Sequence, residues 1–232
     1  MTEPLLYAED IAVRASWGPI YGPTSLSVAP GGVTVLVGSG GRGRTALLLT
    51  LSGRMKPTSG TLTAFGRTND AQHLFNRAAI ADIDEVDGIE QTIRVHDVVT
   101  EQLRWQAKWY KWVPQSRQED LERLCRPVFG DLSIPSMDAY VEELPELTGA
   151  LLRIAMANIR KPPLLVVGGV DRLTRIDSAQ QLLNRLVALG SEQTVITADV
   201  NGVFADSHVR DAVTVHNLTD DEFIRIEEQD LG

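Results

Sequence analysis

The sequence carries Gly38-Ser39-Gly40-Gly41-Arg42-Gly43-Arg44-Thr45, which reads G-x-x-x-x-G-R-T. A phosphate-binding loop has this pattern, with lysine at the place of Arg44. Its glycines let the backbone curl so that successive N–H groups point at phosphate oxygens. We therefore expect residues 38–45 to hold a phosphate group, with the hydroxyl of Thr45 on Mg²⁺.

The flanking residues have the context that this motif requires. Val33-Thr34-Val35-Leu36-Val37 is an apolar run typical of a buried strand, and Ala46 to Leu51 reads as a helix closed by Gly53. A helix start directly behind the loop adds the positive end of its dipole to the phosphate site. Arg44 keeps the positive charge, but its planar fork is bulkier than an ammonium, which favours binding over catalysis. The alternative is a glycine-rich turn without a ligand.

Composition restricts the classes of function. The chain has 232 residues, 43% of them hydrophobic, and a net charge of −9, so it can bury one sizeable core and nucleic acid is not an expected partner. Cys125 is the single cysteine, which favours a reducing compartment. The sequence shows no membrane-spanning run and no basic start of a signal peptide, so we expect a cytoplasmic protein.

The hydrophobic pattern predicts strands that alternate with helices. Strands are expected at residues 6–15, 25–29, 33–37, 61–65, 164–167, 194–197 and 212–215, and helices at 151–159 and 177–189, with a largely helical block from 96 to about 130. This order around a phosphate-binding loop predicts an α/β fold with a mainly parallel sheet.

Two further segments resemble a known family. Ser25-Leu26-Ser27-Val28-Ala29-Pro30-Gly31-Gly32 before the loop, and Lys56-Pro57-Thr58-Ser59-Gly60-Thr61-Leu62 after the first helix, are similar to the nucleotide-binding subunits of ABC transporters. The resemblance implies one P-loop NTPase domain over residues 1–232. Its parts would be a RecA-like α/β core (1–90 and 151–232), an N-terminal antiparallel β subdomain, and an inserted helical subdomain (91–150). It also implies ATP and Mg²⁺ as cofactors.

The chain departs from that family at several catalytic positions. The family's glutamine, which helps to hold Mg²⁺, falls near Asp84-Glu85. Glu85 is a candidate Mg²⁺ ligand, since hard cations prefer oxygen ligands; the alternative is a solvated acidic loop. The family's signature turn aligns with residues 146–150, where Leu147 replaces a serine that donates to phosphate. Gly149 is kept, and its N–H is a candidate phosphate contact; a helix start at Thr148 is the structural alternative.

The acid pair and the switch histidine of the family are also missing. Gly168-Gly169 follows the apolar run 164–167 where the family has Asp-Glu, and neither glycine can hold Mg²⁺ or polarise water. Restoring both acids is expected to raise the rate of hydrolysis if the rest of the site is intact. Asp171 lies beyond that position and is expected to face a partner or solvent. Val200 falls where the family has its histidine.

Aromatic residues suggest two binding surfaces. The family stacks adenine on an aromatic side chain near the end of its first strand, where Trp17 is the candidate and Tyr21 the second choice; an aromatic plug at the sheet edge is the alternative. Trp105, Trp109 and Trp112 share one helical face, which suits either a socket for the membrane subunit or simple core packing.

Taken with the resemblance, these residues indicate a nucleotide-binding subunit of an ABC-type membrane transport complex. It would bind ATP through residues 38–45 and hydrolyse it weakly or not at all. Its expected partners are an integral membrane subunit and a second nucleotide-binding subunit, at the inner face of the membrane. The alternative is a non-catalytic adaptor with the same fold that does not use nucleotide.

Overall fold

The computed structural model describes residues 3–83, 92–107, 110 and 114–215. The strands are β1 (Leu6–Ala15), β2 (Gly18–Val28), β3 (Gly32–Val37), β4 (Ser59–Ala64), β5 (Arg67–Thr68), β6 (Ala78–Ala81), β7 (Leu164–Val167), β8 (Thr194–Asp199) and β9 (Asp211–Thr214). The α-helices are α1 (Arg42–Leu51), α2 (Ala71–Phe75), α3 (Val95–Gln106), α4 (Gln118–Phe129), α5 (Glu146–Ala157) and α6 (Ile176–Gly190). The predicted α/β class with a parallel sheet is confirmed.

The parallel sheet positions the phosphate-binding loop. Its strand order is β6-β7-β8-β3-β9, and every described strand pair in it is parallel. All four residues of β7 are buried, as expected for a strand covered on both faces. Val37 at the end of β3 pairs with Asp199 at the end of β8. The loops that follow β3, β7 and β8 therefore meet at one edge of the sheet, where α/β proteins bind ligands.

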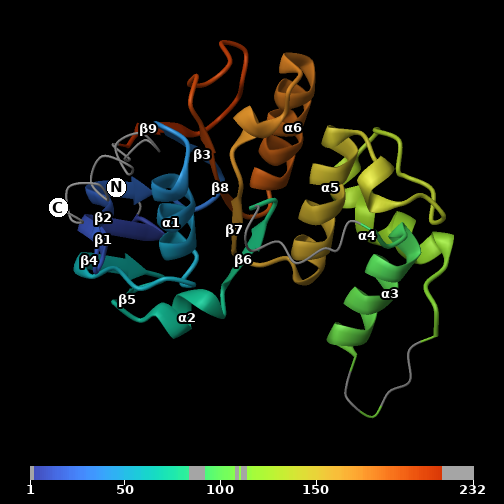
Figure 1. The fold of residues 1–232 in the computed structure, drawn as a ribbon, viewed down its shortest axis with the longest axis horizontal. Coiled ribbons are helices and arrows are strands. Elements are labelled where there is room, and N and C mark those ends of the chain that lie inside the picture. Colours follow the sequence, from blue (N-terminus) through green and yellow to red (C-terminus); the bar gives the residue numbers. More distant parts are fainter. Residues whose placement is uncertain (1–2, 84–91, 108–109, 111–113, 216–232) are drawn as a thin grey trace.

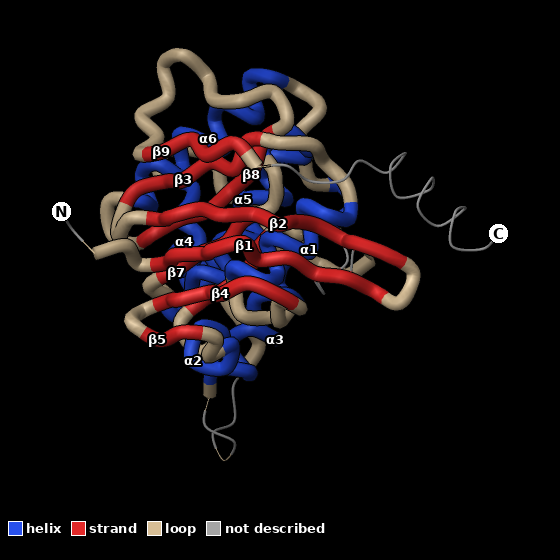
Figure 2. Tube along the Cα trace, turned by 90° about the vertical axis from the view of Figure 1, so that its left-hand side faces the viewer, coloured by secondary structure: helices blue, strands red, loops and turns tan. Residues whose placement is uncertain are grey.

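A second, antiparallel sheet of order β2-β1-β4-β5 lies across the other side of α1 (Figures 1 and 2). Leu47, Leu48 and Leu51 of α1 share one hydrophobic core with both sheets. The opposite face of the parallel sheet is covered by α5 and α6, whose buried side chains include Leu152 and Leu182. The helix behind the phosphate-binding loop is thus held between two layers.

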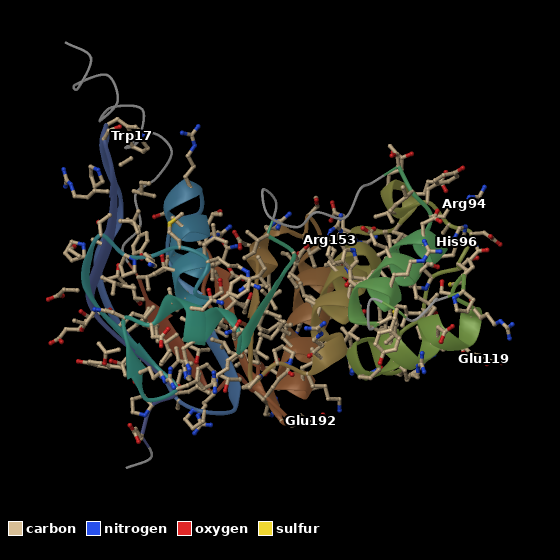
Figure 3. All side chains as sticks on the ribbon, turned by 90° about the horizontal axis from the view of Figure 1, so that it is seen from below. Trp17, Arg94, His96, Glu119, Arg153 and Glu192 are labelled. Atoms are coloured by element: carbon tan, nitrogen blue, oxygen red, sulfur yellow. The ribbon has the colours of Figure 1, made fainter. Side chains whose placement is uncertain are left out.

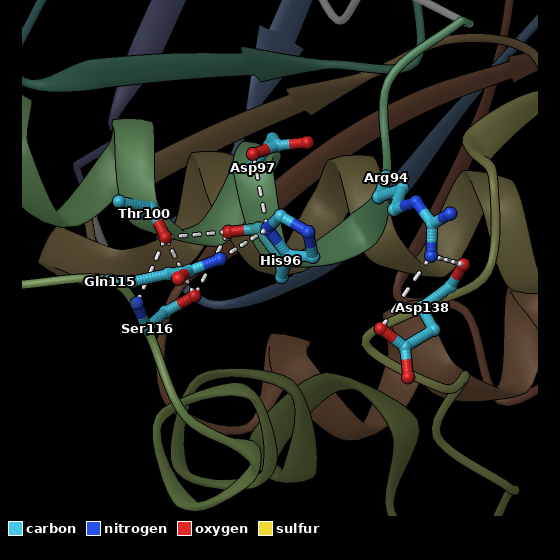
Figure 4. Close-up of polar contacts among 7 residues, drawn as sticks. All are labelled: Arg94, His96, Asp97, Thr100, Gln115, Ser116 and Asp138. Atoms are coloured by element: carbon cyan, nitrogen blue, oxygen red, sulfur yellow. Dashed lines mark hydrogen bonds and ion pairs between the residues drawn. The ribbon is translucent and has the colours of Figure 1, made fainter.

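The helical segment α3 to α5 gathers at one end of the molecule (Figure 1). The chain that enters α4 is tied back to α3 by a polar network (Figure 4). Thr100 Oγ1 donates to Ser116 Oγ at 2.8 Å and accepts the N–H of Ser116 at 2.9 Å, while Gln115 Nε2 lies 3.2 Å from His96 Nδ1. The division into an α/β core and an inserted subdomain stays a prediction.

Five elements differ from the sequence prediction. β2 begins at Gly18 rather than Ser25, although it contains Pro19 and Pro23. β6, β5 and α2 were not predicted, because they are short. α3 ends at Gln106, and Ala107 is in an extended conformation. The prediction of a helix that continues past Ala107 is therefore wrong at this residue. No helix of the described residues is long and apolar enough to cross a membrane.

Candidate functional site

The phosphate-binding loop joins the end of β3 to the start of α1. Gly41 precedes α1 with φ of 96°, a backbone angle that favours glycine, and the N–H of Thr45 donates to the Gly41 carbonyl at 3.2 Å. The N–H of Gly38 donates to the carbonyl of Asp199 at 3.3 Å. The first turn of α1 and the end of β8 therefore hold the loop at both sides.

Arg44 forms an ion pair with Asp171. Its Nη1 donates to Asp171 Oδ1 at 2.9 Å and to Oδ2 at 2.8 Å, and the two side chains are only 12% and 10% exposed. A β-carbon on Gly40 would lie 3.5 Å from Arg44 Nη2, so the guanidinium lies against the glycine-rich loop. The expectation that Asp171 faces a partner or solvent is wrong: this carboxylate, from the segment after β7, pairs with Arg44 of the glycine-rich loop.

Asp199 is a second carboxylate beside this pair. It is 2% exposed, and its Oδ1 accepts the N–H of Asn201 at 2.7 Å. Burial raises the pKa of Asp199 and the charge of Asp171 raises it further, whereas the Asn201 hydrogen bond and Arg44 oppose the shift. The site thus combines one guanidinium with two carboxylates.

A cleft of about 370 Å³ opens beside these carboxylates. Asp171 and Asp199 line it together with apolar residues that include Leu173, Val203 and Phe204. The cleft begins where the loops after β7 and β8 meet, so it is continuous with the carboxylates of the site.

The two glycines after β7 have no room for the acids that the family places there. A β-carbon on Gly169 would overlap Asp171 Oδ1 and lie 3.0 Å from Arg44 Cζ. A β-carbon on Gly168 would overlap the carbonyl oxygen of Asp82, which accepts from Arg172 Nη1. The carbonyl of Asp82 therefore leaves no space for an acid at Gly168, whereas an acid at Gly169 would require the ends of the Asp171 and Arg44 side chains to move.

The expected signature turn lies inside α5. α5 begins at Glu146 after Pro145, so a helix start at Thr148 is wrong by two residues. The N–H of Gly149 donates to the Pro145 carbonyl at 2.9 Å, which makes the candidate phosphate contact at Gly149 wrong as well. Leu147 packs against the core beside α5. This helix start is fixed by its own backbone hydrogen bonds.

Glu146 instead ties α5 to the segment before α6. Its carboxylate accepts the N–H of Thr174 at 2.9 Å and the Thr174 hydroxyl at 2.7 Å. These hydrogen bonds lower the pKa of Glu146 because they stabilise the charged form. The start of α5 is thereby linked to the loop that carries Asp171.

The aromatic candidates differ in how far their side chains are buried. Tyr21 is fully buried in the core, and burial raises its pKa to about 12, so the second choice for adenine stacking is wrong. Trp17 lies in the turn between β1 and β2, half-buried, at the tip of that hairpin (Figure 3). Trp105 is 74% exposed, which excludes core packing for it; Trp109 and Trp112 lie outside the described residues.

The metal candidates are not tested by the geometry. Glu85 lies outside the described residues. Thr45 lies half-buried in the first turn of α1, where its role as an Mg²⁺ ligand stays a prediction. The described part of the chain holds no group of three or more histidine, cysteine, aspartate or glutamate residues arranged to bind a metal. Sequence reasoning named Asp171 but missed its pairing with Arg44, because the two residues lie 127 positions apart in the chain.

One family model and several curated proteins are similar to this chain. The model of the ABC transporter family matches residues 21–167. The cytochrome c biogenesis ATP-binding export protein CcmA of Cupriavidus pinatubonensis is 31% identical over 105 residues, 45% of each chain. The hemin import ATP-binding protein HmuV of Rhizobium meliloti is 38% identical over 63 residues, 27% of this chain and 24% of that relative. The chain thus spans less than half the length of these curated relatives.

Solved structures show the same fold. The cbiO1 protein from Clostridium perfringens, part of the ABC transporter complex cbiONQ, superposes with a TM-score of 0.69 at 17% identity, over 96% of this chain and 94% of that one. MJ1267, an ATP-binding cassette of an ABC transporter, gives a TM-score of 0.71 at 15% identity, over 98% and 96% of the two chains.

Proposed function

Because the chain belongs to the ABC transporter family, we propose that it is the nucleotide-binding subunit of an ABC-type membrane transport complex and binds ATP through residues 38–45. The observation that carries this proposal is the loop between β3 and α1. Its glycines, the N-terminal turn of α1 and Arg44 lie together at the carboxyl edge of the parallel sheet. Backbone N–H groups and a positive charge at a helix start are the chemistry that recognises phosphate.

The same site supports weak or absent hydrolysis. The glycines at the end of β7 supply no carboxylate, and Val200 supplies no histidine side chain after β8. Loss of one general base commonly costs 10²- to 10⁴-fold in rate, and these losses coincide. The chain binds nucleotide with Mg²⁺, held by Thr45 and by Glu85, and turns it over slowly on its own.

We propose two protein partners for this chain. An integral membrane subunit holds the chain at the cytoplasmic face of the membrane, and the exposed indole of Trp105 is the described part of the surface that contacts it. A second nucleotide-binding subunit completes the pair, and a competent partner carries the acids and histidine that this chain lacks. Adenine stacks on Trp17 at the tip of the β1–β2 hairpin.

One observation favours a different function. Asp171 already neutralises the charge that Arg44 would offer to phosphate. A non-catalytic adaptor, which keeps the fold to hold or regulate a membrane protein without nucleotide, accounts for a loop closed in this way.

An equilibrium titration of the purified chain with labelled ATP separates the two functions. The nucleotide-binding subunit binds ATP, binds it more tightly with Mg²⁺, and binds it more weakly, though still measurably, in Arg44→Ala. Asp138→Asn, which removes an exposed carboxylate at the opposite end of the molecule, serves as the control and leaves the affinity unchanged. If the wild-type chain binds no ATP at millimolar Mg-ATP, the adaptor is the correct function.

A further inference from the structure

We propose that Asp171 sets the nucleotide affinity of the loop by competing with phosphate for Arg44. This inference rests on the proposed function, since it concerns the same site. Phosphate must displace the Asp171 carboxylate from the guanidinium before the guanidinium can bind phosphate. Removing the carboxylate therefore tightens binding, the opposite of what removing a ligand-binding group does.

Arg44 is already paired with an anion from within the protein. One nitrogen, Nη1, contacts both oxygens of Asp171, and Nη2 lies against Gly40 of the loop. Both side chains are about one-tenth exposed, so water weakens the pair little. A guanidinium held this way is an anion site that an internal anion already occupies.

The space around Gly169 allows this pairing. The Asp171 carboxylate stands where the side chain of residue 169 would begin, and any β-carbon there would overlap it. Glycine at this position is what allows the carboxylate to reach Arg44. The three residues therefore depend on one another: because Gly169 has no side chain, Asp171 has room to pair with Arg44.

A second carboxylate adds negative charge to the site. Asp199 lies beside the pair, and its pKa is raised first by burial and then by the negative charge of Asp171. An incoming triphosphate adds further negative charge. Of the two carboxylates, only Asp171 has a hydrogen bond to Arg44 among the described contacts, so it competes directly with the ligand, whereas Asp199 acts only through its charge.

The test is a titration of wild type and Asp171→Asn with ATP, once with excess Mg²⁺ and once with a chelator. Asparagine keeps the shape of the side chain and removes its charge. We expect Asp171→Asn to bind ATP about tenfold more tightly or better in both conditions, because one charge-assisted contact no longer has to be broken. Thermal unfolding of both proteins confirms that each is folded.

Two matched variants show whether the gain passes through Arg44. Asp199→Asn makes the same change of charge beside the same site, and we expect it to tighten binding less than threefold. In an Arg44→Ala background, Asp171→Asn should change the affinity less than twofold. A gain in Asp199→Asn equal to that in Asp171→Asn would overturn the proposal, because it would assign the effect to general charge.

The outcomes for this inference and for the proposed function differ. Unchanged or weaker binding by Asp171→Asn, with ATP bound by wild type, overturns the competition and leaves the proposed function standing. Binding by Asp171→Asn but not by wild type supports the competition and favours the adaptor for the native chain. If neither protein binds ATP, both proposals fail.

Discussion

Adding one methyl group at Gly169 tests the central pair without touching either charged residue. Gly169 has φ of −65° and ψ of 135°, which alanine adopts without strain. Its β-carbon would overlap Asp171 Oδ1 and crowd Arg44. Gly169→Ala should therefore separate the ion pair while leaving both of its members in the chain.

The magnitude follows from the burial of the pair. Hydrogen bonds to charged groups contribute roughly 1.5–3 kcal/mol, and both side chains are nearly buried. Alanine in place of glycine offsets about 0.4–1 kcal/mol by restricting the unfolded chain. We expect a net loss of about 1–2 kcal/mol in the free energy of unfolding, together with tighter ATP binding because Arg44 is released.

Urea unfolding followed by circular dichroism measures this difference, with the slope against denaturant checked for two-state behaviour. The control is the same substitution in an Asp171→Ala background. There the methyl group meets no carboxylate, and we expect no loss of stability. A Gly169→Ala protein as stable as wild type, or more stable, would refute the reasoning.

Three further predictions concern other parts of the site. Gly43→Val should abolish ATP binding measured by titration, because a branched side chain in the loop collides with phosphate; retained affinity would contradict the loop's role. Gly168→Asp combined with Gly169→Glu should not restore ATP turnover in a phosphate-release assay and should lower the melting temperature, since the side chain at 168 would overlap the Asp82 backbone and the one at 169 would displace Asp171 and Arg44; a large gain in rate would contradict this. The pKa of Glu146 is lowered in the folded state, so its contribution is present above the ordinary glutamate pKa of about 4.3 and is lost as pH falls below it. The stability advantage of wild type over Glu146→Gln should thus shrink between about pH 6 and pH 3 in unfolding experiments. An advantage that does not change with pH would show that the charge of Glu146 does not stabilise the fold.

Long periodic elements could be predicted from the sequence, whereas short ones could not. β1 was predicted with its exact bounds because it is ten residues long and its buried apolar side chains, which include Leu6, Ile11 and Val13, are interspersed with polar ones. β6 was missed because Ala78–Ala81 is short and three of its four residues are alanine, which has weak strand propensity. It is a strand because it pairs with β7, which supplies the hydrogen bonds and the buried surface. Tertiary pairing decided this element.

The phosphate-binding loop could be located from its glycines, but its electrostatics could not. Spacing along the chain places Arg44 at the start of a helix. It carries no information about Asp171, which reaches Arg44 only after β7 and β3 lie in one sheet. The space available at Gly168 and Gly169 likewise depends on the Asp82 carbonyl and the Asp171 carboxylate, whose positions are set by the fold. Sequence reasoning therefore read these glycines as simple losses.

The crowding around residues 168 and 169 also bears on how this chain can change over evolutionary time. A single mutation that placed an acid at position 169 would displace Asp171, and one at position 168 would collide with the backbone of Asp82. Each such change should lower stability until its neighbours change as well. An acid at either position is therefore accessible to this chain only together with compensating substitutions nearby.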